Sequence, residues 1–253
     1  MEIRTIFDTI PERFDRYRPR YCPELFESLI RYAGIGPGSS ALEIGPGTGQ
    51  ATEPILRTGC DYQAIELGEH LCGMMRRNFG QYPNFSIVHD DFITHDFGGR
   101  TFDRVYSAAT IQWIPEEIAY PKVFELLNPG GTLAMMLTRC DYRTPNEALW
   151  QRIQQVYAAH YKPDTPYAQR GFGYTNPPLY GFEQFEQQTF KSTRRMDAEA
   201  YVGYCGTHCD HLTIPEPHKT AFFDGLRQAV LEAGDSITFL DTHVLYLAKK
   251  PMG

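Results

Sequence analysis

The chain lacks any apolar stretch long enough to cross a membrane. Its best apolar run is Leu133–Leu137, far short of the roughly 18 residues that a membrane-spanning helix needs. The first residues, MEIRTIFDTIPERFDRYRPR, are charged throughout and contain no apolar segment of the kind found in secretory signals. We therefore expect no membrane partner, no secretory signal and a cytoplasmic location.

Paired cysteines and an excess of positive charge are also absent. The six cysteines are scattered without a C-x-x-C pair, which favours reduced, buried thiols. Lys and Arg number 24 against 31 Asp and Glu, a formal net charge of −7. Because a nucleic-acid partner usually requires a basic face, we expect none. A local basic patch near the N-terminus stays open (Arg4, Arg13, Arg16, Arg18 and Arg20), although a solvated helix face explains these arginines better.

The 253 residues suffice for one large α/β domain with an insertion, or for a core with a small cap. Up to residue 138, segments typical of strands alternate with segments typical of helices, which predicts βαβ units and a parallel sheet. The expected strands are Ser40–Ile44, Tyr62–Glu66, Phe85–His89, Phe102–Ser107 and Thr132–Thr138. The expected helices are Pro23–Ala33, Gln50–Thr58, His70–Phe79 and Ile118–Leu127, with a turn at 128–131.

After Thr138 the pattern changes. Helices are expected at Pro145–Tyr161, Asp197–Cys205 and Pro217–Ala233, strands at Phe182–Phe190 and Ile237–Ala248, and an ordered loop or lid at Lys162–Tyr180. We therefore predict an α/β fold: a three-layer, Rossmann-like sandwich whose seven-stranded sheet is mostly parallel, with an antiparallel C-terminal strand and a helical cap. The expected domains are an N-terminal lid and first helix (1–39), a ligand-binding core (40–139), cap insertions (140–181 and 191–216) and core-completing segments (182–190 and 217–253).

The most informative segment is Ala41–Gly49, ALEIGPGTG. An apolar run leads to Glu43 and then to three glycines at alternate positions, Gly45, Gly47 and Gly49. Glycines let the backbone turn sharply and approach a ligand, and a following helix start adds N–H groups and partial positive charge. The segment predicts a nucleotide-type ligand site, although an ordinary glycine turn can also have this sequence.

Two acidic features follow at the ends of the next two expected strands, where open α/β sheets bind ligands. Glu66 ends the second strand and can accept both hydroxyls of a ribose. Asp90 and Asp91 follow the third strand, and a carboxylate there can accept a hydrogen bond from an adenine amino group. We favour Asp91 for this role, with Phe92 flanking the ring.

A fourth feature follows the fourth expected strand. The small side chains that begin at Ser107 leave room for a ligand, and Gln112 and Trp113 can form a pocket wall. Each of the four features has a purely structural explanation when taken alone. Their occurrence in the correct order is a much stronger signal than any one of them.

With these motifs the chain resembles class I S-adenosylmethionine-dependent methyltransferases. More narrowly, it resembles the small-molecule group that includes trans-aconitate methyltransferase-like proteins. The resemblance covers roughly residues 10–140 and rests on LEIGPGTG, AIE, HDDF, FDRVYSAATIQWIP, LLNPGGTL and the earlier FDRYRPRYCPELFESL. It implies transfer of the sulfonium methyl group to a small-molecule O or N acceptor by in-line displacement without a metal, with S-adenosyl-L-homocysteine as product.

The resemblance also implies which residues bind the cofactor, S-adenosyl-L-methionine. Arg18, in the expected N-terminal lid, would pair with the cofactor carboxylate, although a surface charge is an equally open interpretation. Glu43 would support the glycine turn, and Ser107 would lie beside the methionine amine and the sulfonium. The full set is Tyr17, Arg18, Glu43, Gly45, Gly47, Gly49, Glu66, Leu67, Asp91, Phe92, Ser107, Gln112 and Trp113.

Two other functions remain open at this point: an NAD(P)-dependent oxidoreductase of similar topology, and a non-catalytic S-adenosylmethionine-binding regulator. Dinucleotide sites usually have the spacing G-x-G-x-x-G, whereas this chain has G-x-G-x-G. The spacing therefore favours the methyl donor. A monomer and a homodimer are both compatible with the sequence.

Catalytic residues are expected after the helix predicted at 197–205. Tyr204, His208 and His211 are hypothesised to line the acceptor pocket, and a histidine there can take a proton near neutral pH. Cys205, His208, Cys209 and His211 are all able to bind a metal, but side chains packed so tightly at a helix end cannot all point at one ion. We therefore predict no metal site.

Overall fold

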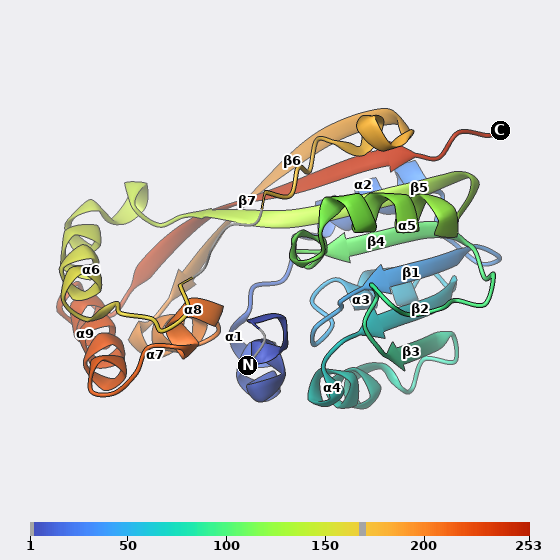
Figure 1. Ribbon diagram of the computed structural model, residues 1–253. Helices are drawn as coiled ribbons and strands as arrows, with labels where there is room; N and C mark the ends of the chain where they lie inside the picture. The colour runs from blue at the N-terminus through green and yellow to red at the C-terminus, as the bar shows by residue number, and fades with distance from the viewer. Residues whose placement is uncertain (1–2, 167–170) are drawn as a thin grey trace. The chain divides into compact units, whose positions relative to one another are not determined.

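Figure 1 shows the computed structural model, which describes residues 3–166 and 171–253. The described residues divide by their contacts into two compact units. The sheet unit comprises residues 19–138, 171–190 and 243–253, and the helical unit comprises residues 3–18, 139–166 and 191–242. Of the segments predicted above, residues 1–2 of the N-terminal lid and 167–170 of the loop at 162–180 lie outside the described residues.

The sheet has seven strands in the order β3-β2-β1-β4-β5-β7-β6. Neighbouring strands from β3 to β5 pair in parallel, and β7 runs in the opposite direction (Figure 1). The strands are β1 (Ser40–Ile44), β2 (Asp61–Glu66), β3 (Phe85–His89), β4 (Phe102–Ala108), β5 (Leu127–Asp141), β6 (Glu183–Met196) and β7 (Ile237–Lys249). The predicted Rossmann-like fold with its antiparallel C-terminal strand is confirmed.

Helices cover both faces of the sheet because side chains of each strand alternate between the two faces. Ala41 and Tyr62 pack toward α2, α3 and α4, whereas Leu42, Ile44 and Val105 pack toward α5. The helices of the sheet unit are α2 (Pro23–Ala33), α3 (Thr52–Leu56), α4 (Glu69–Phe79), α5 (Glu116–Leu126) and the short 3₁₀ helices η2 (Ile111–Trp113) and η4 (Pro177–Tyr180).

Some element boundaries differ from those predicted, for identifiable reasons. The helix expected at Gln50–Thr58 is shortened to α3, since Gly49 has a left-handed φ of 96° and the chain is still in a turn at Ala51. Strand β5 begins at Leu127 rather than at Thr132. The residues predicted to form a turn at 128–131 belong to the strand. They pair with the end of the chain: Gly130 donates to the Lys250 carbonyl (3.1 Å), and Lys250 donates to the Gly131 carbonyl (2.9 Å).

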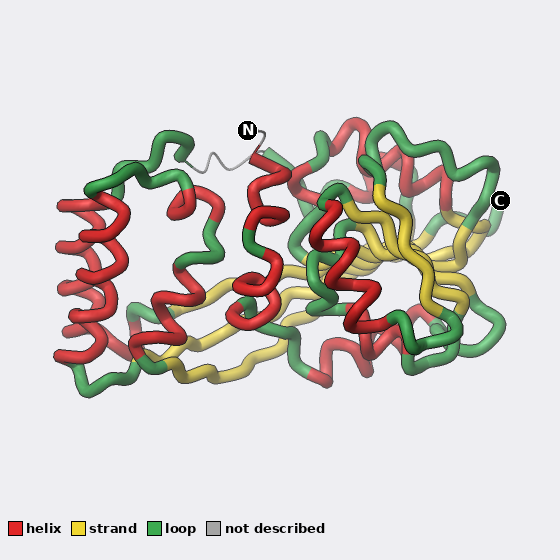
Figure 2. Tube along the Cα trace, turned by 90° about the horizontal axis from the view of Figure 1, so that it is seen from below, coloured by secondary structure: helices red, strands yellow, loops and turns green. Residues whose placement is uncertain are grey.

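The helical unit has its own apolar core. Leu226 and Val230 of α9 pack with Ile153 of α6 and Tyr201 of α7, and α6 lies beside α9 (Figure 2). The sequence had grouped Pro217–Ala233 with the strands of the core, whereas this packing groups α9 with α6 and α7. The unit's helices are η1 (Ile3–Thr9), α1 (Pro11–Tyr17), η3 (Thr144–Asn146), α6 (Glu147–His160), α7 (Ala198–Cys205), α8 (Cys209–Leu212) and α9 (His218–Glu232).

A buried ion pair lies in the helical unit. The Asp241 carboxylate is 2% exposed and accepts hydrogen bonds from Arg194 Nε (2.8 Å) and Nη2 (3.1 Å). The Arg194 guanidinium also lies over the rings of Phe239 (4.5 Å) and Tyr204 (5.1 Å). The stability of each buried charge depends on the other, because removal of either group leaves the remaining charge uncompensated.

We expect Asp241→Asn to destabilise the helical unit by about 3 kcal/mol, since it leaves Arg194 without its counter-charge. Asp61→Asn is the matched control, because Asp61 pairs with Arg100 at the surface, where the side chains are 67% and 41% exposed. Exposed pairs contribute about 0–1 kcal/mol. Urea unfolding followed by Trp150 fluorescence in a Trp113→Phe background measures the first variant, and circular dichroism compares both. Equal stability of the two variants would refute the ion-pair argument.

Candidate functional site

The glycine turn between β1 and α3 has the backbone conformation that its sequence predicts. Gly45 and Gly47 have φ of 62° and Gly49 has φ of 96°, values that disfavour any other residue. Space is restricted as well: a Cβ on Gly45 would lie 2.1 Å from Thr110 Cγ2, and one on Gly49 would lie 2.1 Å from Phe79 Cε2. Gly45 and Gly49 are therefore required for two independent reasons, and Gly47 for its backbone conformation.

Glu66 ties this turn to the end of β2. Its side chain is buried at 6% exposure. One carboxylate oxygen accepts the Gly47 N–H (2.9 Å) and the other accepts the Gly68 N–H (3.0 Å). A carboxylate held by two backbone donors beside a glycine turn is suitably placed to accept ribose hydroxyls, so this geometry fits the predicted cofactor. Leu67, the next residue, accepts at its carbonyl from His89 Nε2 at 3.2 Å.

Glu43 lies beneath the turn and is fully buried. Its Oε2 accepts hydrogen bonds from the hydroxyls of Thr52 (2.6 Å), Tyr62 (2.6 Å) and Tyr106 (2.8 Å). Burial raises the pKa of the Glu43 carboxyl, and the three hydroxyls oppose that rise. Its Oε1 is buried and has no hydrogen-bond partner among the described residues.

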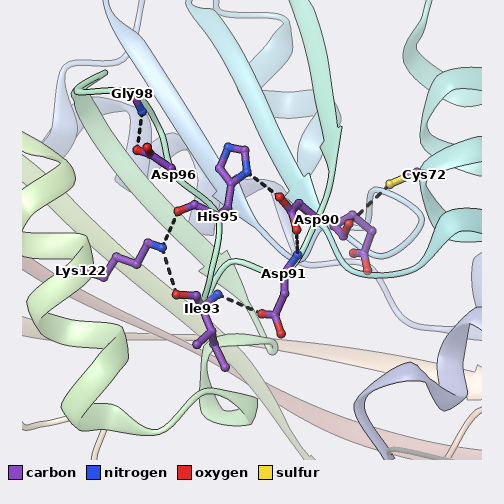
Figure 3. Close-up of polar contacts among 9 residues, drawn as sticks. Cys72, Asp90, Asp91, Ile93, His95, Asp96, Gly98 and Lys122 are labelled. Atoms are coloured by element: carbon purple, nitrogen blue, oxygen red, sulfur yellow. Dashed lines mark hydrogen bonds and ion pairs between the residues drawn. The ribbon is translucent and has the colours of Figure 1, made fainter.

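The loop after β3 brings both acidic candidates to the edge of the sheet (Figure 3). Asp90 accepts from His95 Nδ1 (2.8 Å) and from the backbone N–H of Asp91 (2.8 Å). Asp91 accepts the N–H of Ile93 at 2.9 Å, and Phe92 is buried at 4% exposure. Both carboxylates thus have partners within the protein, and the choice of Asp91 for adenine stays a prediction.

The end of β4 and the segment after it also lie in the sheet unit, but their polar groups bond within the protein. Ser107 is fully buried and donates to the Ile44 carbonyl (3.0 Å). Gln112 donates to the Ala109 carbonyl (2.9 Å) and accepts from the Tyr174 hydroxyl (2.6 Å). Trp113, the last residue of η2, is partly exposed.

Two residues that the sequence did not single out hold the glycine turn. Thr110 donates its hydroxyl to the Gly45 carbonyl (2.7 Å), and Arg20 Nη1 donates to the Gly49 carbonyl (3.1 Å). Neither contact follows from the glycine pattern, since both partners come from distant parts of the chain. The arginine cluster near the N-terminus gave the only signal for Arg20.

The remaining predicted residues belong to the helical unit. Tyr17 ends α1, where its ring packs closely on Gly203. Arg18 follows it, donates to the Thr207 carbonyl (2.7 Å) and lies over the Phe14 ring (5.2 Å). One nitrogen of the Arg18 guanidinium is thus bonded to the backbone, and the interaction of Arg18 with a cofactor carboxylate stays a prediction.

The structure brings Tyr204, His208 and His211 together. The His208 ring lies 4.7 Å from the Tyr204 ring and 4.8 Å from the His211 ring. His211 has a fixed tautomer: its Nδ1 is 2.9 Å from the Cys205 carbonyl, which can only accept, so Nε2 accepts from the Tyr157 hydroxyl at 3.1 Å. The His208 ring has these two ring contacts and no hydrogen bond among the described residues.

Burial and charge keep both histidines neutral. Burial lowers the pKa of His208 well below its ordinary value, and the nearby Arg18 charge and His211 lower it further. Burial also lowers the pKa of His211, against the raising effects of Asp210 and the Cys205 carbonyl. Burial raises the pKa of the Tyr204 hydroxyl, which is therefore protonated at neutral pH.

The geometry of this cluster bears on the prediction of no metal. Ligand atoms of His208, Asp210 and His211 all lie within 4.8 Å of one another, a group that includes Asp210 and neither of the two cysteines considered in the sequence. Both His211 nitrogens and Asp210 already have protein partners, however, since Tyr161 donates to Asp210 at 2.7 Å. The absence of a metal site stays a prediction.

Among the described residues, no helix is long and apolar enough to cross a membrane.

Comparison with known protein families finds a match over the segment that contains the glycine turn and the following strand ends. Residues 41–131 match the family described as a methyltransferase domain. Over these residues the chain is similar to a methyltransferase domain, in agreement with the resemblance described above. The cofactor that the sequence predicts, S-adenosyl-L-methionine, is the one that this family uses.

The curated relatives align with only part of this chain. The chain is 33% identical over 114 residues to ribosomal RNA small subunit methyltransferase A of Marinobacter nauticus, covering 45% of this chain and 41% of that protein. It is 27% identical over 164 residues to the same enzyme of Chromohalobacter salexigens, covering 61% and 58%. The chain thus spans less than two thirds of the length of either relative.

Solved structures share the fold at low identity. Phosphoethanolamine N-methyltransferase 2 of Haemonchus contortus, bound to phosphomonomethylethanolamine and S-adenosylhomocysteine, has a TM-score of 0.59 at 14% identity, covering 99% of this chain and 60% of that one. The [4+2]-cyclase SpnF has a TM-score of 0.51 at 14% identity, covering 91% and 82%. A cyclase on this fold shows that the fold alone does not determine the reaction.

The buried Glu43 predicts a pH dependence of stability. Because its folded-state pKa is raised above the ordinary 4.5, the folded chain keeps a proton that the unfolded chain loses as pH rises from 4.5 to the folded pKa. Stability of the wild type relative to Glu43→Gln should therefore fall across that window. Thermal unfolding at a series of pH values measures this difference.

Glu53→Gln is the control with the opposite sign. A hydrogen bond from Arg57 lowers the pKa of the Glu53 carboxyl below 4.5. Stability that depends on Glu53 is therefore present above pH 4.5 and is lost as pH falls through the lowered pKa. If the two differences changed with pH in the same direction, the assignment of a raised pKa to Glu43 would fail.

Proposed function

We propose that the chain is a methyltransferase that moves the methyl group of S-adenosylmethionine to a small-molecule acceptor. One observation carries the proposal: in a domain of the methyltransferase family, Glu66 holds the glycine turn through the Gly47 and Gly68 N–H groups. When bound, the cofactor supplies an electrophilic methyl group on a positively charged sulfur. The protein then chiefly has to align the acceptor and exclude water.

The turn and the loop after β3 bind the cofactor in this proposal. Glycines at 45, 47 and 49 leave the backbone open to the methionine part, and Glu66 accepts the ribose hydroxyls. Asp91 accepts the adenine amino group, and Phe92 packs against the ring. The side chain of Glu43 fixes the turn from below through its three hydroxyl contacts.

The helical unit supplies the acceptor pocket, with Tyr204, His208 and His211. Of the two histidines, His208 is the better base, because the Tyr157 hydroxyl occupies the lone pair of His211. His208 is kept neutral by burial and by the Arg18 charge, so it can accept a proton from an acceptor O–H or N–H. An acceptor that has a free lone pair needs no such step.

Ribosomal RNA is a second candidate acceptor. Curated relatives named as ribosomal RNA methyltransferases favour it. The formal net charge of −7 weighs against it, since nucleic-acid partners usually meet a basic surface. Tritium transfer from labelled S-adenosylmethionine, with a small-molecule library in one arm and small-subunit ribosomal RNA in the other, separates the two.

We expect Glu66→Gln to weaken binding of S-adenosylmethionine and S-adenosylhomocysteine by roughly tenfold or more, because it removes the charged acceptor of the ribose and loosens Gly47. Calorimetric titration measures both ligands and NAD. Glu69→Gln is the control, since Glu69 is exposed at the start of α4.

Binding of NAD in place of the first two ligands would reject the methyltransferase proposal in favour of an oxidoreductase. Tight cofactor binding with no transfer to any acceptor would favour the non-catalytic regulator.

We expect His208→Asn to lower kcat roughly 100-fold or more with the acceptor that the tritium screen identifies, if that acceptor must lose a proton. Because the pKa of His208 is lowered from 6.5, the wild-type rate should hold below pH 6.5 and decline only as pH falls through the lowered value. His160→Asn in the same unit is the control. Full turnover of His208→Asn would remove His208 from the base role.

A further inference from the structure

Lys122 reaches from α5 to the loop that carries the adenine candidates (Figure 3). Its Nζ donates to the carbonyl of His95 at 2.7 Å and to the carbonyl of Ile93 at 3.2 Å. Ile93 directly follows Phe92 in the chain, and His95 comes two residues later. One side chain therefore fixes two backbone positions of this loop.

The surroundings of Lys122 are unusual for a lysine. Most lysines extend the ammonium group into water, but this Nζ lies 5.2 Å from the centre of the Phe92 ring and 5.7 Å from that of Phe97. Burial lowers the pKa of the Lys122 ammonium, while the charges of Asp91 and the other nearby carboxylates favour the charged form. Desolvation of the ammonium has a cost, which the two carbonyls and two rings offset.

A second contact closes the same loop from within. His95 Nδ1 lies 2.8 Å from Asp90 Oδ2, and the backbone N–H of His95 donates to the Asp91 carbonyl at 2.9 Å. The His95 ring also meets the Phe97 ring edge-on, with centres 4.5 Å apart. The residues from 90 to 97 thus form a compact turn, and Lys122 is its attachment to α5.

We propose that Lys122 is a positioning residue of the cofactor site, which holds the loop at 90–97 so that Asp91 and Phe92 meet the adenine ring. The inference rests on the proposed function, since the loop has this role only if the chain binds an adenine-containing methyl donor. Lys122 itself does not touch the cofactor in this arrangement. It acts through the carbonyls of Ile93 and His95 and through the Phe92 ring.

The chain offers a matched control for a lysine that only stabilises the fold. Lys250, also in the sheet unit, donates to the Leu127 carbonyl at 2.7 Å and lies 4.9 Å from the centre of the Phe124 ring. Its contacts are of the same kind as those of Lys122 but hold the end of α5 and the start of β5. If Lys122 were only structural, Lys122→Met and Lys250→Met would have the same effect on ligand binding.

Calorimetric titration with S-adenosylhomocysteine and S-inosylhomocysteine tests the proposal. The second ligand replaces the adenine amino group by an oxo group, so it removes the donor that Asp91 accepts. We expect the wild type to prefer S-adenosylhomocysteine, and Lys122→Met to lose roughly tenfold of that affinity because two carbonyl contacts are gone. The affinity ratio of the two ligands should fall toward one in Lys122→Met, stay unchanged in Lys250→Met and be largely restored in Lys122→Arg.

Thermal unfolding of each variant shows whether it is folded at the titration temperature, and the ratio of the two affinities is independent of any loss of active protein. If Lys122→Met kept both the affinity and the preference of the wild type, the positioning role would be refuted while the proposed function stood. If the wild type bound neither ligand, the proposed function would fail first and the inference with it.

Discussion

A single buried oxygen, Oε2 of Glu43, holds together the elements that form the ligand edge of the sheet unit. It accepts hydroxyl groups from α3, β2 and β4 while Glu43 itself belongs to β1. Tyr106 is the direct partner of Glu43 in the register of β1 and β4. Burial of a carboxyl has a high cost unless hydrogen bonds compensate it, so these three contacts are a condition for the strand to carry Glu43 at all.

The glycine turn depends on this contact because Glu43 and Thr52 lie just before and just after it. Their 2.6 Å hydrogen bond closes the base of the turn, and the bond from Gly47 to Glu66 fixes its middle. A turn held at both places has little freedom left to lose when a ligand binds, and such preorganisation favours tight and specific binding. The two carboxylates therefore act together on one short stretch of backbone.

Local patterns in the sequence were sufficient to predict the sheet unit. The alternation of strand-like and helix-like segments predicted the parallel sheet, the glycine spacing predicted the turn, and the order of acidic residues after successive strands predicted the ligand edge. What the sequence could not reveal are contacts between a side chain and a distant carbonyl, such as those of Thr110, Arg20 and Lys122. Such contacts leave no periodic pattern, because one of the two partners is backbone and can belong to any residue. The sequence did not reveal that α9 packs with α6 and α7, for a related reason. A helix followed by a strand has the same hydrophobic pattern whether it packs on the sheet core or in a separate unit.

The two histidines of the helical unit show the same limit at the level of a single site. His208 and His211 are three residues apart and identical in chemistry, so the sequence treats them alike. Their neighbours separate them, since the Cys205 carbonyl and the Tyr157 hydroxyl take both nitrogens of His211. The fold itself, which a cyclase shares, leaves the reaction open. Under the proposed function, specificity for an acceptor is expected to come from side chains such as His208, whose pKa is lowered by burial and by the Arg18 charge, and not from the architecture of the sheet.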